Sequence, residues 1–350
     1  MSEAVAAPMQ PAVDPHQQLF GIFAGFRQSR ALAIAAELEF ADHLAAEPQH
    51  LDELAKRTKT HAPSLFRLLR ALESIGVFRQ LSPHVFTNTP MSNLLRKDVP
   101  GSLLALIRNA CCVGEGSYEG WGGLLGSVQT GQTAFDQIYG YDYWEFLRRN
   151  PRQAATFNEM MRSVTAQVTP AVTAAYDWSR FPVIADVGGG IGSQLVDILT
   201  AHSLCRGILY DQPDVVATAI PHDRMQCIGG SFFEKAPSGA DAYLLRMVIH
   251  DWPEKEAVAI LKNVRQAMKP ASHLVLIENV IPETSDYAHG KWLDLHMMAL
   301  AGGRERTAKE YRELYSQAGF TLEQIVPTAA PHSLIFGHPT SVSAFHEKAG

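Results

Sequence analysis

The sequence predicts an α/β protein in which a mainly parallel sheet, covered on both faces by helices, follows a mainly helical N-terminal region. Two observations support this prediction. After Trp178, short apolar runs alternate with helix-length segments, a pattern typical of parallel strands connected by helices. Before Trp178, apolar residues recur at the spacings of amphipathic helices. Because 350 residues exceed what one hydrophobic core usually serves, we expect more than one domain.

The N-terminal region predicts a winged-helix domain at residues 16–110, after a flexible tail at residues 1–15 that lacks apolar periodicity. Proline near the first turn and glycine at the end mark the longest of its later helices. A Ser-Pro-His turn between two apolar runs predicts a hairpin. The expected elements are one or two helices over Gln17–Ala45, a short helix over His50–Arg57, a helix from Pro63 to Gly76, and strands at Val77–Leu81 and Val85–Thr87.

A helical connector is expected at residues 111–177, within a mostly helical stretch from about Asp98 onward. The segment between Gly114 and Gly131 is rich in glycine, so we expect it to be a loop or a lid. We expect this connector to contribute to a substrate pocket.

Residues 178–350 are expected to form the sheet domain. A helix should open near Ser193, and a capping box of Thr307 and Glu310 should start another that ends near Gly319. The expected strands are Val183–Val187, Gly207–Tyr210, Ala242–Leu245 and Leu274–Ile277, with a helix over Glu254–Met268 before the last.

Charge and cysteine content exclude several classes of function. The net charge of −6 and the isoelectric point near 6.2 provide no positive field for nucleic acid or an anionic membrane. The four cysteines lack metal-ligand spacing and are expected to be reduced packing residues. No leader or membrane-spanning run is evident, so we expect a soluble cytoplasmic protein without a membrane partner.

A glycine-rich loop follows the first expected strand, in the run Asp186-Val187-Gly188-Gly189-Gly190-Ile191-Gly192. Glycine tolerates positive φ and lets a ligand approach the backbone closely. A dinucleotide fingerprint that used Gly188 and Gly190 would need a third glycine where Ser193 stands, which weakens that interpretation. Asp211 ends the next strand about 20 residues on, where a ribose diol would bind. The loop alone leaves an S-adenosylmethionine site, a nucleotide oxidoreductase and a structural turn as alternatives.

Three further motifs follow the loop in a fixed order. They are Leu244–Trp252 with His250-Asp251-Trp252 at its end, Leu276–Val280 with Glu278 at its centre, and Asp294–Thr307 with Gly302-Gly303-Arg304-Glu305 near its end. Together they resemble the class I S-adenosylmethionine-dependent O-methyltransferases, which include caffeate-type, acetylserotonin, hydroxyneurosporene, polyketide and phenazine enzymes. The resemblance covers nearly the whole chain. It implies a Rossmann-like catalytic domain with a mainly parallel seven-stranded sheet, and a homodimer formed through the winged-helix domain.

The resemblance also implies roles for particular residues. His250 falls on the catalytic base, and Glu278 and Glu305 fall on the carboxylates that orient it. Many members have Asp where this chain has Ser231, so one expected adenine acceptor is lost. The cofactor positions are Asp186, Gly188, Gly190, Asp211, Ser231, Phe232 and Arg246, and the acceptor-pocket positions are Phe157, Met161, Asp294 and Met297.

Elementary chemistry agrees with this assignment. Methyl transfer from a sulfonium is an in-line displacement, which needs no metal and requires mainly that a hydroxyl be held in place and deprotonated. A neutral imidazole with a pKa of about 6.5 suits that step near neutral pH. We therefore expect S-adenosyl-L-methionine as cofactor, S-adenosyl-L-homocysteine as product, and an aromatic hydroxyl or N-hydroxy compound, a secondary metabolite, as acceptor.

Other interpretations stay open at this point. His250 could be a hydrogen-bonded corner, and Glu305 could be only a charge at a helix start. A member of the family could use the scaffold for decarboxylation, hydroxylation or a pericyclic reaction. A winged-helix regulator is the remote alternative, because Arg67 and Arg70 lie on the would-be recognition helix, yet that helix is mostly apolar.

Overall fold

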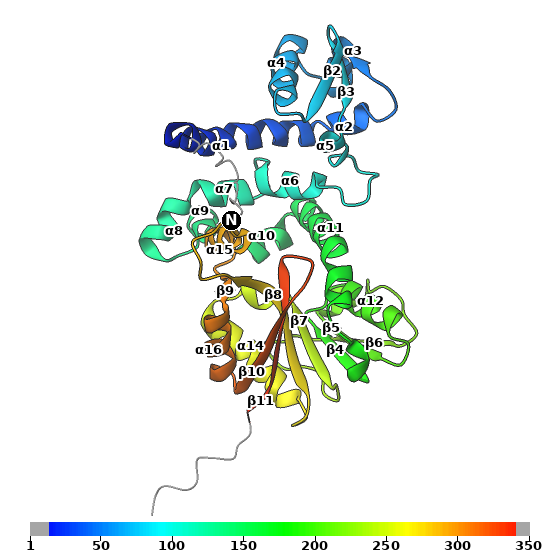
Figure 1. Cartoon of the computed structure of the whole chain (residues 1–350), viewed down its shortest axis with the longest axis vertical. Helices are drawn as coiled ribbons and strands as arrows, with labels where there is room; N and C mark the ends of the chain where they lie inside the picture. Colours follow the sequence, from blue (N-terminus) through cyan, green and yellow to red (C-terminus); the bar gives the residue numbers. More distant parts are fainter. Residues whose placement is uncertain (1–13, 341–350) are drawn as a thin grey trace, which may run out of the picture. The chain divides into compact units, whose positions relative to one another are not determined.

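The computed structural model describes residues 14–340 and divides after Glu115 into two compact units (Figure 1). The predicted tail at residues 1–15 lies outside the described residues except for its end, where Asp14 caps a helix that begins at Pro15. The predicted division into a tail, a winged-helix domain, a connector and a sheet domain stays a prediction. Among the described residues, no helix is long and apolar enough to cross a membrane.

The first unit is mainly helical with a small three-stranded sheet. The predicted helices and hairpin are present, and the sheet gains a strand, β1, that was not expected because it has only two residues. Its core includes Phe40, Leu54, Leu69 and Phe86, all fully buried. The elements are α1 (Pro15–Glu37), α2 (Phe40–His43), β1 (Gln49–His50), α3 (Leu51–Thr58), α4 (Ala62–Glu73), β2 (Phe78–Ser82), β3 (Val85–Asn88), α5 (Pro90–Asn93) and α6 (Leu104–Cys111).

One face of α1 is apolar and exposed within its unit. Five large side chains along its first three turns are 54–77% exposed: Leu19, Phe20, Ile22, Phe23 and Phe26. Adjacent apolar side chains of this size are uncommon on a surface that stays in water.

The second unit begins with a run of helices, and here the expected loop is wrong, whereas the lid role stays a prediction. The glycine-rich segment between Gly114 and Gly131 contains two helices rather than an open loop. Its glycines allow close packing: a Cβ at Gly120 would lie 3.1 Å from Leu300 Cδ1, and one at Gly123 would lie 2.9 Å from Ile138 Cδ1. The helices are α7 (Ser117–Gly122), α8 (Leu124–Thr130), α9 (Ala134–Tyr139), α10 (Tyr143–Arg149) and α11 (Pro151–Ala174).

The sheet of the second unit is mainly parallel, as predicted. Its strands run in the order β10-β11-β8-β7-β4-β5-β6, with β9 paired to β8. Only β10 and β11 are antiparallel to their neighbours. The strands are β4 (Val183–Val187), β5 (Arg206–Asp211), β6 (Met225–Gly229), β7 (Ala242–Arg246), β8 (His273–Ile281), β9 (Arg306–Thr307), β10 (Phe320–Pro327) and β11 (His332–Pro339).

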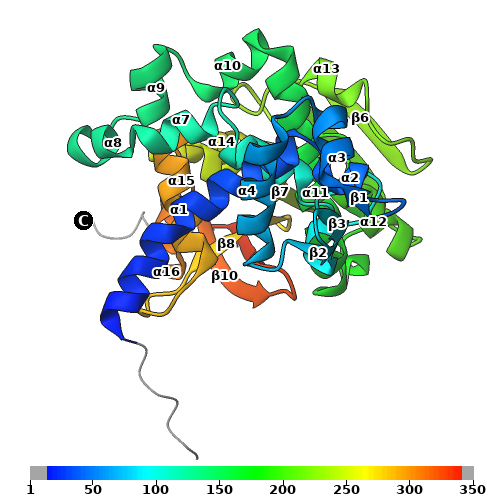
Figure 2. The same cartoon turned by 90° about the horizontal axis from the view of Figure 1, so that it is seen from above.

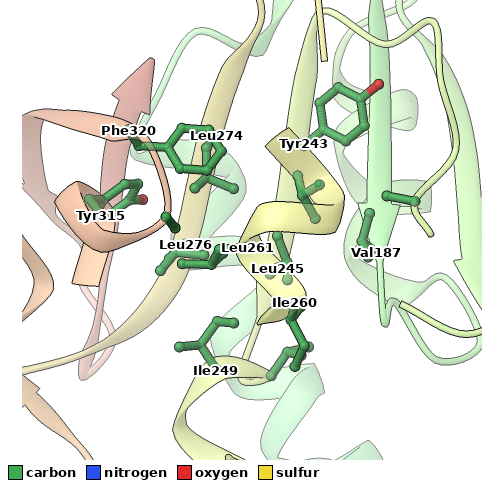
Figure 3. Close-up of a cluster of buried hydrophobic side chains, with 14 of the residues drawn as sticks. Val187, Tyr243, Leu245, Ile249, Ile260, Leu261, Leu274, Leu276, Tyr315 and Phe320 are labelled. Atoms are coloured by element: carbon green, nitrogen blue, oxygen red, sulfur yellow. The ribbon is translucent and has the colours of Figure 1, made fainter. Parts of the chain in front are cut away.

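Helices cover both faces of this sheet (Figures 1 and 2). On one face, Leu245 and Leu276 pack against Leu261 and Tyr315 (Figure 3). On the other face, Leu244 and Ile277 belong to a separate core. The first face is covered by α14 (Glu254–Ala267) and α16 (Ala308–Gln317), and the second by α11 and α12 (Ser193–Ala201). The remaining elements are η1 (Trp178–Arg180), α13 (Pro213–Val216), η2 (Ile249–Asp251) and α15 (His289–Leu300).

All four cysteines are free thiols, and Cys112 and Cys205 are buried. The predicted capping box of α16 is also present, since Thr307 and Glu310 each accept the other's backbone N–H.

Candidate active site

The glycine-rich loop lies at the carboxyl end of β4. Gly188, Gly190 and Gly192 have φ values of 72°, 61° and 85°, in the left-handed region that glycine adopts without strain. A side chain at Gly189 would lie 2.6 Å from the carboxyl carbon of Asp186, whereas one at Gly190 would meet nothing within 4 Å. The loop thus packs tightly on the strand below it and leaves open space above Gly190.

Asp211, at the end of β5, holds this loop in place. Its Oδ2 accepts the N–H of Gly190 at 2.8 Å, and its Oδ1 accepts the N–H of Gln212 at 2.7 Å. Burial raises the pKa of Asp211, while these two backbone donors oppose the shift. Each oxygen keeps a further lone pair that could accept from a ligand hydroxyl.

Asp186 and Arg246 lie on the same face of adjacent strands, beneath the loop. Asp186 is buried, and within the described part of the chain its Oδ1 has no hydrogen-bond partner. Burial raises its pKa to about 7, against the opposing charge of Arg246. Arg246 donates to the Thr165 hydroxyl at 2.8 Å and, more weakly, to the Thr169 hydroxyl at 3.4 Å. A buried carboxyl oxygen without a hydrogen-bond partner, near a guanidinium, suits a ligand that carries both an amino and a carboxylate group.

Phe232 lies beside the loop and Ser231 precedes it in the chain, while their predicted position near an adenine stays a prediction. The Ser231 hydroxyl accepts the N–H of Phe233 at 3.3 Å, and its carbonyl accepts from the Tyr210 hydroxyl at 3.2 Å. The Phe232 ring lies 3.4 Å from where a Cβ of Gly188 would stand. The left-handed glycines, the orphaned oxygen of Asp186 and the Phe232 ring together fit an adenosyl amino acid such as S-adenosylmethionine.

His250 lies in a short 3-10 turn, η2, just past the end of β7. Its Nδ1 is 2.7 Å from Glu305 Oε1 and 3.6 Å from Glu278 Oε2. Its Nε2 is 3.4 Å from Asp251 Oδ1. The structure therefore brings together the three predicted catalytic residues and places the carboxylate of Asp251 beside them.

Backbone contacts fix this cluster. Glu278 Oε1 accepts the N–H groups of Val248 and Ile249 at 3.1 and 2.9 Å, so it holds the turn that carries His250. The Arg304 N–H donates to the His250 carbonyl at 2.9 Å, and a side chain at Gly303 would collide with that same oxygen. The Gly-Gly-Arg-Glu motif thus needs its second glycine so that two backbone segments can touch.

The protonation of His250 differs from the expectation. Burial alone would lower its pKa, but the carboxylates of Glu278, Asp251 and Glu305 outweigh burial and raise the pKa to about 10. Burial also raises the pKa of Glu278 to about 7 and that of Asp251 to about 6, against the pull of His250. The expected ordinary imidazole pKa is therefore wrong, because the sequence does not reveal how many carboxylates surround the ring.

The same atoms satisfy the spacing of a metal site. One ligand atom each from His250, Glu278 and Glu305 lie within 4.8 Å of one another, and all three residues are buried. Two of these carboxylate oxygens already accept hydrogen bonds, from the His250 ring and from the turn. The other oxygens, Glu278 Oε2 and Glu305 Oε2, have no hydrogen-bond partner among the described residues.

Two of the predicted pocket residues have clear surroundings. Phe157 on α11 meets Tyr143 and Trp144 edge to face, with ring centroids 5.8 and 5.9 Å away. Trp144 stacks on Trp252, two residues after His250, at 6.4 Å. Asp294 on α15 accepts the N–H of Glu305 at 2.9 Å, so it holds the segment that carries Glu305.

The remaining two predicted pocket residues are methionines. Met297 on α15 is buried, and Met161 on α11 is partly buried. Their predicted contact with an acceptor, like that of Phe157 and Asp294, stays a prediction.

Three polar residues near the site were missed by sequence reasoning. His296 on α15 accepts from the Trp121 indole at 2.9 Å. His332, at the start of β11, is buried with both ring nitrogens unpartnered among the described residues, and so is the side-chain nitrogen of Asn279, its neighbour on β8. The sequence shows His296 next to the predicted Met297, but no pattern indicates that His332 and Asn279 lie side by side.

Comparisons with known proteins identify the class. Residues 121–321 match the O-methyltransferase domain family and residues 20–98 the O-methyltransferase dimerisation domain. A phenazine O-methyltransferase of Lysobacter antibioticus is 40% identical over 328 residues, which cover 92% of this chain and 95% of that protein.

Two solved structures are similar over most of the chain. The crystal structure of LaPhzM has a TM-score of 0.87 and 39% identity, covering 93% of this chain and 100% of that one. The structure of NcsB1 from neocarzinostatin biosynthesis, in complex with S-adenosylmethionine and 2-hydroxy-5-methyl naphthoic acid, has a TM-score of 0.78 and 31% identity, covering 96% and 100%.

The fold and the matched domains define an S-adenosylmethionine-dependent methyltransferase. The chain belongs to the class I O-methyltransferase family with an N-terminal dimerisation domain. Its cofactor is S-adenosylmethionine, as in the complexes of its structural neighbours.

Proposed function

We propose that this enzyme methylates a hydroxyl or N-hydroxy group of an aromatic small molecule, a secondary metabolite, with His250 as the general base. The observation that carries the proposal is the orientation of the His250 ring. Its Nδ1 is held by Glu305 at 2.7 Å, so the neutral ring carries its proton there and its Nε2 lone pair is the acceptor, with Asp251 Oδ1 3.4 Å away.

The reaction then follows from the residues in place. The acceptor hydroxyl gives its proton to His250 Nε2 as its oxygen forms a bond to the methyl carbon, and the pair of electrons of the broken carbon–sulfur bond goes to sulfur. S-adenosylmethionine supplies the methyl group on a sulfonium. Glu278, Glu305 and Asp251 stabilise the imidazolium that results, which is the reason their charges raise the pKa of His250.

In this proposal the cofactor is held by residues of the glycine loop and of the strand ends around it. They are Asp186, Gly188, Gly190, Asp211, Ser231, Phe232 and Arg246. Arg246 and the unpartnered oxygen of Asp186 bind the carboxylate and ammonium groups of its amino-acid end. Asp211 accepts from the ribose, and the Phe232 ring packs against the adenine. None of these roles requires a metal ion.

An aromatic acceptor is favoured by the side chains around α10 and α11. Phe135, Tyr143 and Phe146 form a buried cluster, against which Trp121 and Phe157 pack. Aromatic rings favour stacked or edge-to-face contact with a flat ligand over contact with a flexible aliphatic chain. Stacking of Trp144 on Trp252 connects this cluster to the turn that carries His250.

The dimerisation domain match supports a homodimer, and α1 offers a surface for it. A second copy of the chain would cover the exposed apolar face of α1. This face consists of Leu19, Phe20, Ile22, Phe23 and Phe26. Light scattering should give the dimer mass for the wild type and the monomer mass for Leu19→Ser/Phe23→Ser. Leu204→Ser, which alters a residue 87% exposed in the second unit, should stay dimeric. A dimeric double variant would contradict this interface.

The function is tested by mass spectrometry after incubation with S-adenosylmethionine carrying a labelled methyl group. The panel should hold aromatic hydroxyl, N-hydroxy and amine compounds, with aliphatic alcohols as controls. We expect labelled methyl ethers from aromatic hydroxyl or N-hydroxy compounds only. Labelled products from amines or aliphatic alcohols alone, or a product without the label, would contradict the proposal.

A further inference from the structure

The pair formed by Trp121 and His296 fixes the proton on a second histidine near the reaction centre. Trp121 lies on α7 and His296 on α15, and the indole nitrogen is 2.9 Å from Nδ1. An indole N–H can only donate, so Nδ1 must accept. The neutral ring therefore carries its proton on Nε2.

The surroundings keep this ring neutral. Burial lowers the pKa of His296 to about 4, and the neighbouring His250 and His289 act in the same direction. Within residues 14–340, Trp121 is the one hydrogen-bond partner of the ring. At neutral pH His296 thus presents an Nε2–H donor that no described residue uses.

The same helix that carries this donor also supports the catalytic cluster. Asp294, two residues before His296, accepts the N–H of Glu305, and Glu305 holds the His250 ring. At the end of α15, Leu300 packs closely on Gly120 of α7. Helix α15 therefore fixes the His296 donor relative to the His250 base.

We propose that His296 selects the acceptor, by donating from Nε2 to a second polar atom, an oxygen or a ring nitrogen, on the aromatic ring system that His250 deprotonates. This rests on the proposed function. Such a neutral donor favours a heteroaromatic nitrogen, a carbonyl or a carboxylate over a carbon–hydrogen edge of the same shape, because an unpaired donor in a buried site costs binding energy. Trp121 is the positioning residue, since it keeps the proton on Nε2.

The test compares 1-naphthol with its hydroxyquinoline analogues, in which one ring carbon is replaced by nitrogen at different distances from the hydroxyl. We expect the wild-type enzyme to prefer at least one hydroxyquinoline over 1-naphthol by about tenfold in kcat/KM. His296→Leu should abolish this preference through a rise in KM for that hydroxyquinoline, while 1-naphthol is methylated within about twofold of the wild-type rate.

A second variant guards against misfolding. Trp121→Phe keeps an aromatic ring but removes the donor to Nδ1, so it should reduce the same preference. Trp292→Phe makes the same chemical change at an exposed site on α15 and should leave the preference intact. Cofactor affinity, measured by calorimetry, should be unchanged in all three variants.

The outcomes separate the two proposals. Absence of labelled product from every aromatic acceptor would overturn the proposed function. Methylation of 1-naphthol and all hydroxyquinolines with equal efficiency, or a preference that survives His296→Leu, would overturn the role of His296 and leave the proposed function standing.

Discussion

Two histidines in the second unit, buried His250 and partly buried His296, are held in opposite protonation states. At His250 a carboxylate accepts from Nδ1, and the surrounding acids raise the pKa to about 10. At His296 an indole donates to Nδ1, and burial lowers the pKa to about 4. The contact at Nδ1 makes Nε2 an acceptor in the neutral form of the His250 ring and a donor in the His296 ring.

The difference shows that the partner at one ring nitrogen decides what the other nitrogen can do. Glu305 prepares His250 to take a proton, and Trp121 prepares His296 to give a hydrogen bond. Helix α15 contacts both of these partner residues. Asp294 on α15 accepts the N–H of Glu305, and His296 on α15 accepts from the Trp121 indole. Because each ring has its own partner residue, the effects of the two rings on activity can be measured separately with single substitutions.

The largest effect should follow loss of the His250 ring. We expect His250→Ala to lower kcat by about a thousandfold, because the general base that takes the hydroxyl proton is lost. The affinity for S-adenosylmethionine, measured by calorimetry, should change by less than about threefold, since the His250 ring makes no hydrogen bond to the predicted cofactor residues in the described part of the chain. A variant that methylates at the wild-type rate would rule out His250 as the base.

The next largest effect should follow a change in the backbone contact beneath His250. Gly303→Ala places a methyl group against the His250 carbonyl, so the ring must shift, and we expect kcat to fall about a hundredfold. Gly122→Ala, where a methyl group meets nothing within 4 Å, is the matched control and should keep wild-type activity. Equal rates for the two variants would show that the contact does not position the ring.

Removal of one carboxylate should shift the pH dependence. A raised His250 pKa means that the neutral base becomes more abundant with increasing pH, so wild-type kcat/KM should rise from pH 7 toward about 10. In Glu305→Gln a negative neighbour is lost, the pKa of His250 falls, and the rise should move to lower pH. If the rise in kcat/KM reflects His250, its position on the pH axis should be the same for acceptors of different acidity. If it reflects ionisation of the acceptor, its position should change with the acceptor. If kcat/KM of Glu305→Gln rises over the same pH range as that of the wild type, the assignment of this rise to His250 is wrong.

The smallest effect should be on cofactor binding. Arg246→Met removes a charged donor beneath the glycine loop, and we expect about tenfold weaker binding of S-adenosylmethionine by calorimetry. Arg265→Met, on the opposite face of the sheet, should bind as the wild type does. Unchanged affinity in Arg246→Met would remove Arg246 from the cofactor site.

Much of the fold could be predicted from the sequence, because helices and strands leave local patterns of apolar, glycine and capping residues along the chain. Apolar runs such as Val183–Val187 mark strands that are buried on both faces, and the glycine loop and the capping box of α16 are local patterns. The edge strand β6 was missed, because its residues are mostly exposed and carry no continuous apolar signal.

What the sequence could not give is the number of groups around each ring. His250 and Glu305 are 55 residues apart, and Trp121 and His296 are 175 apart. The resemblance supplied the first pair, but nothing local supplies the second. The pKa values depend on such distant neighbours, which explains why the expected ordinary imidazole at His250 was wrong.

The contrast between the two rings can be measured directly by nitrogen NMR of the protein labelled in its histidines, with His250→Ala and His296→Leu used to assign the signals. We predict that His296 stays neutral with its proton on Nε2 from neutral pH down to about pH 4, and that His250 stays protonated well above neutral pH. Titration of both rings near the ordinary imidazole pKa, or a His296 proton on Nδ1, would contradict this account.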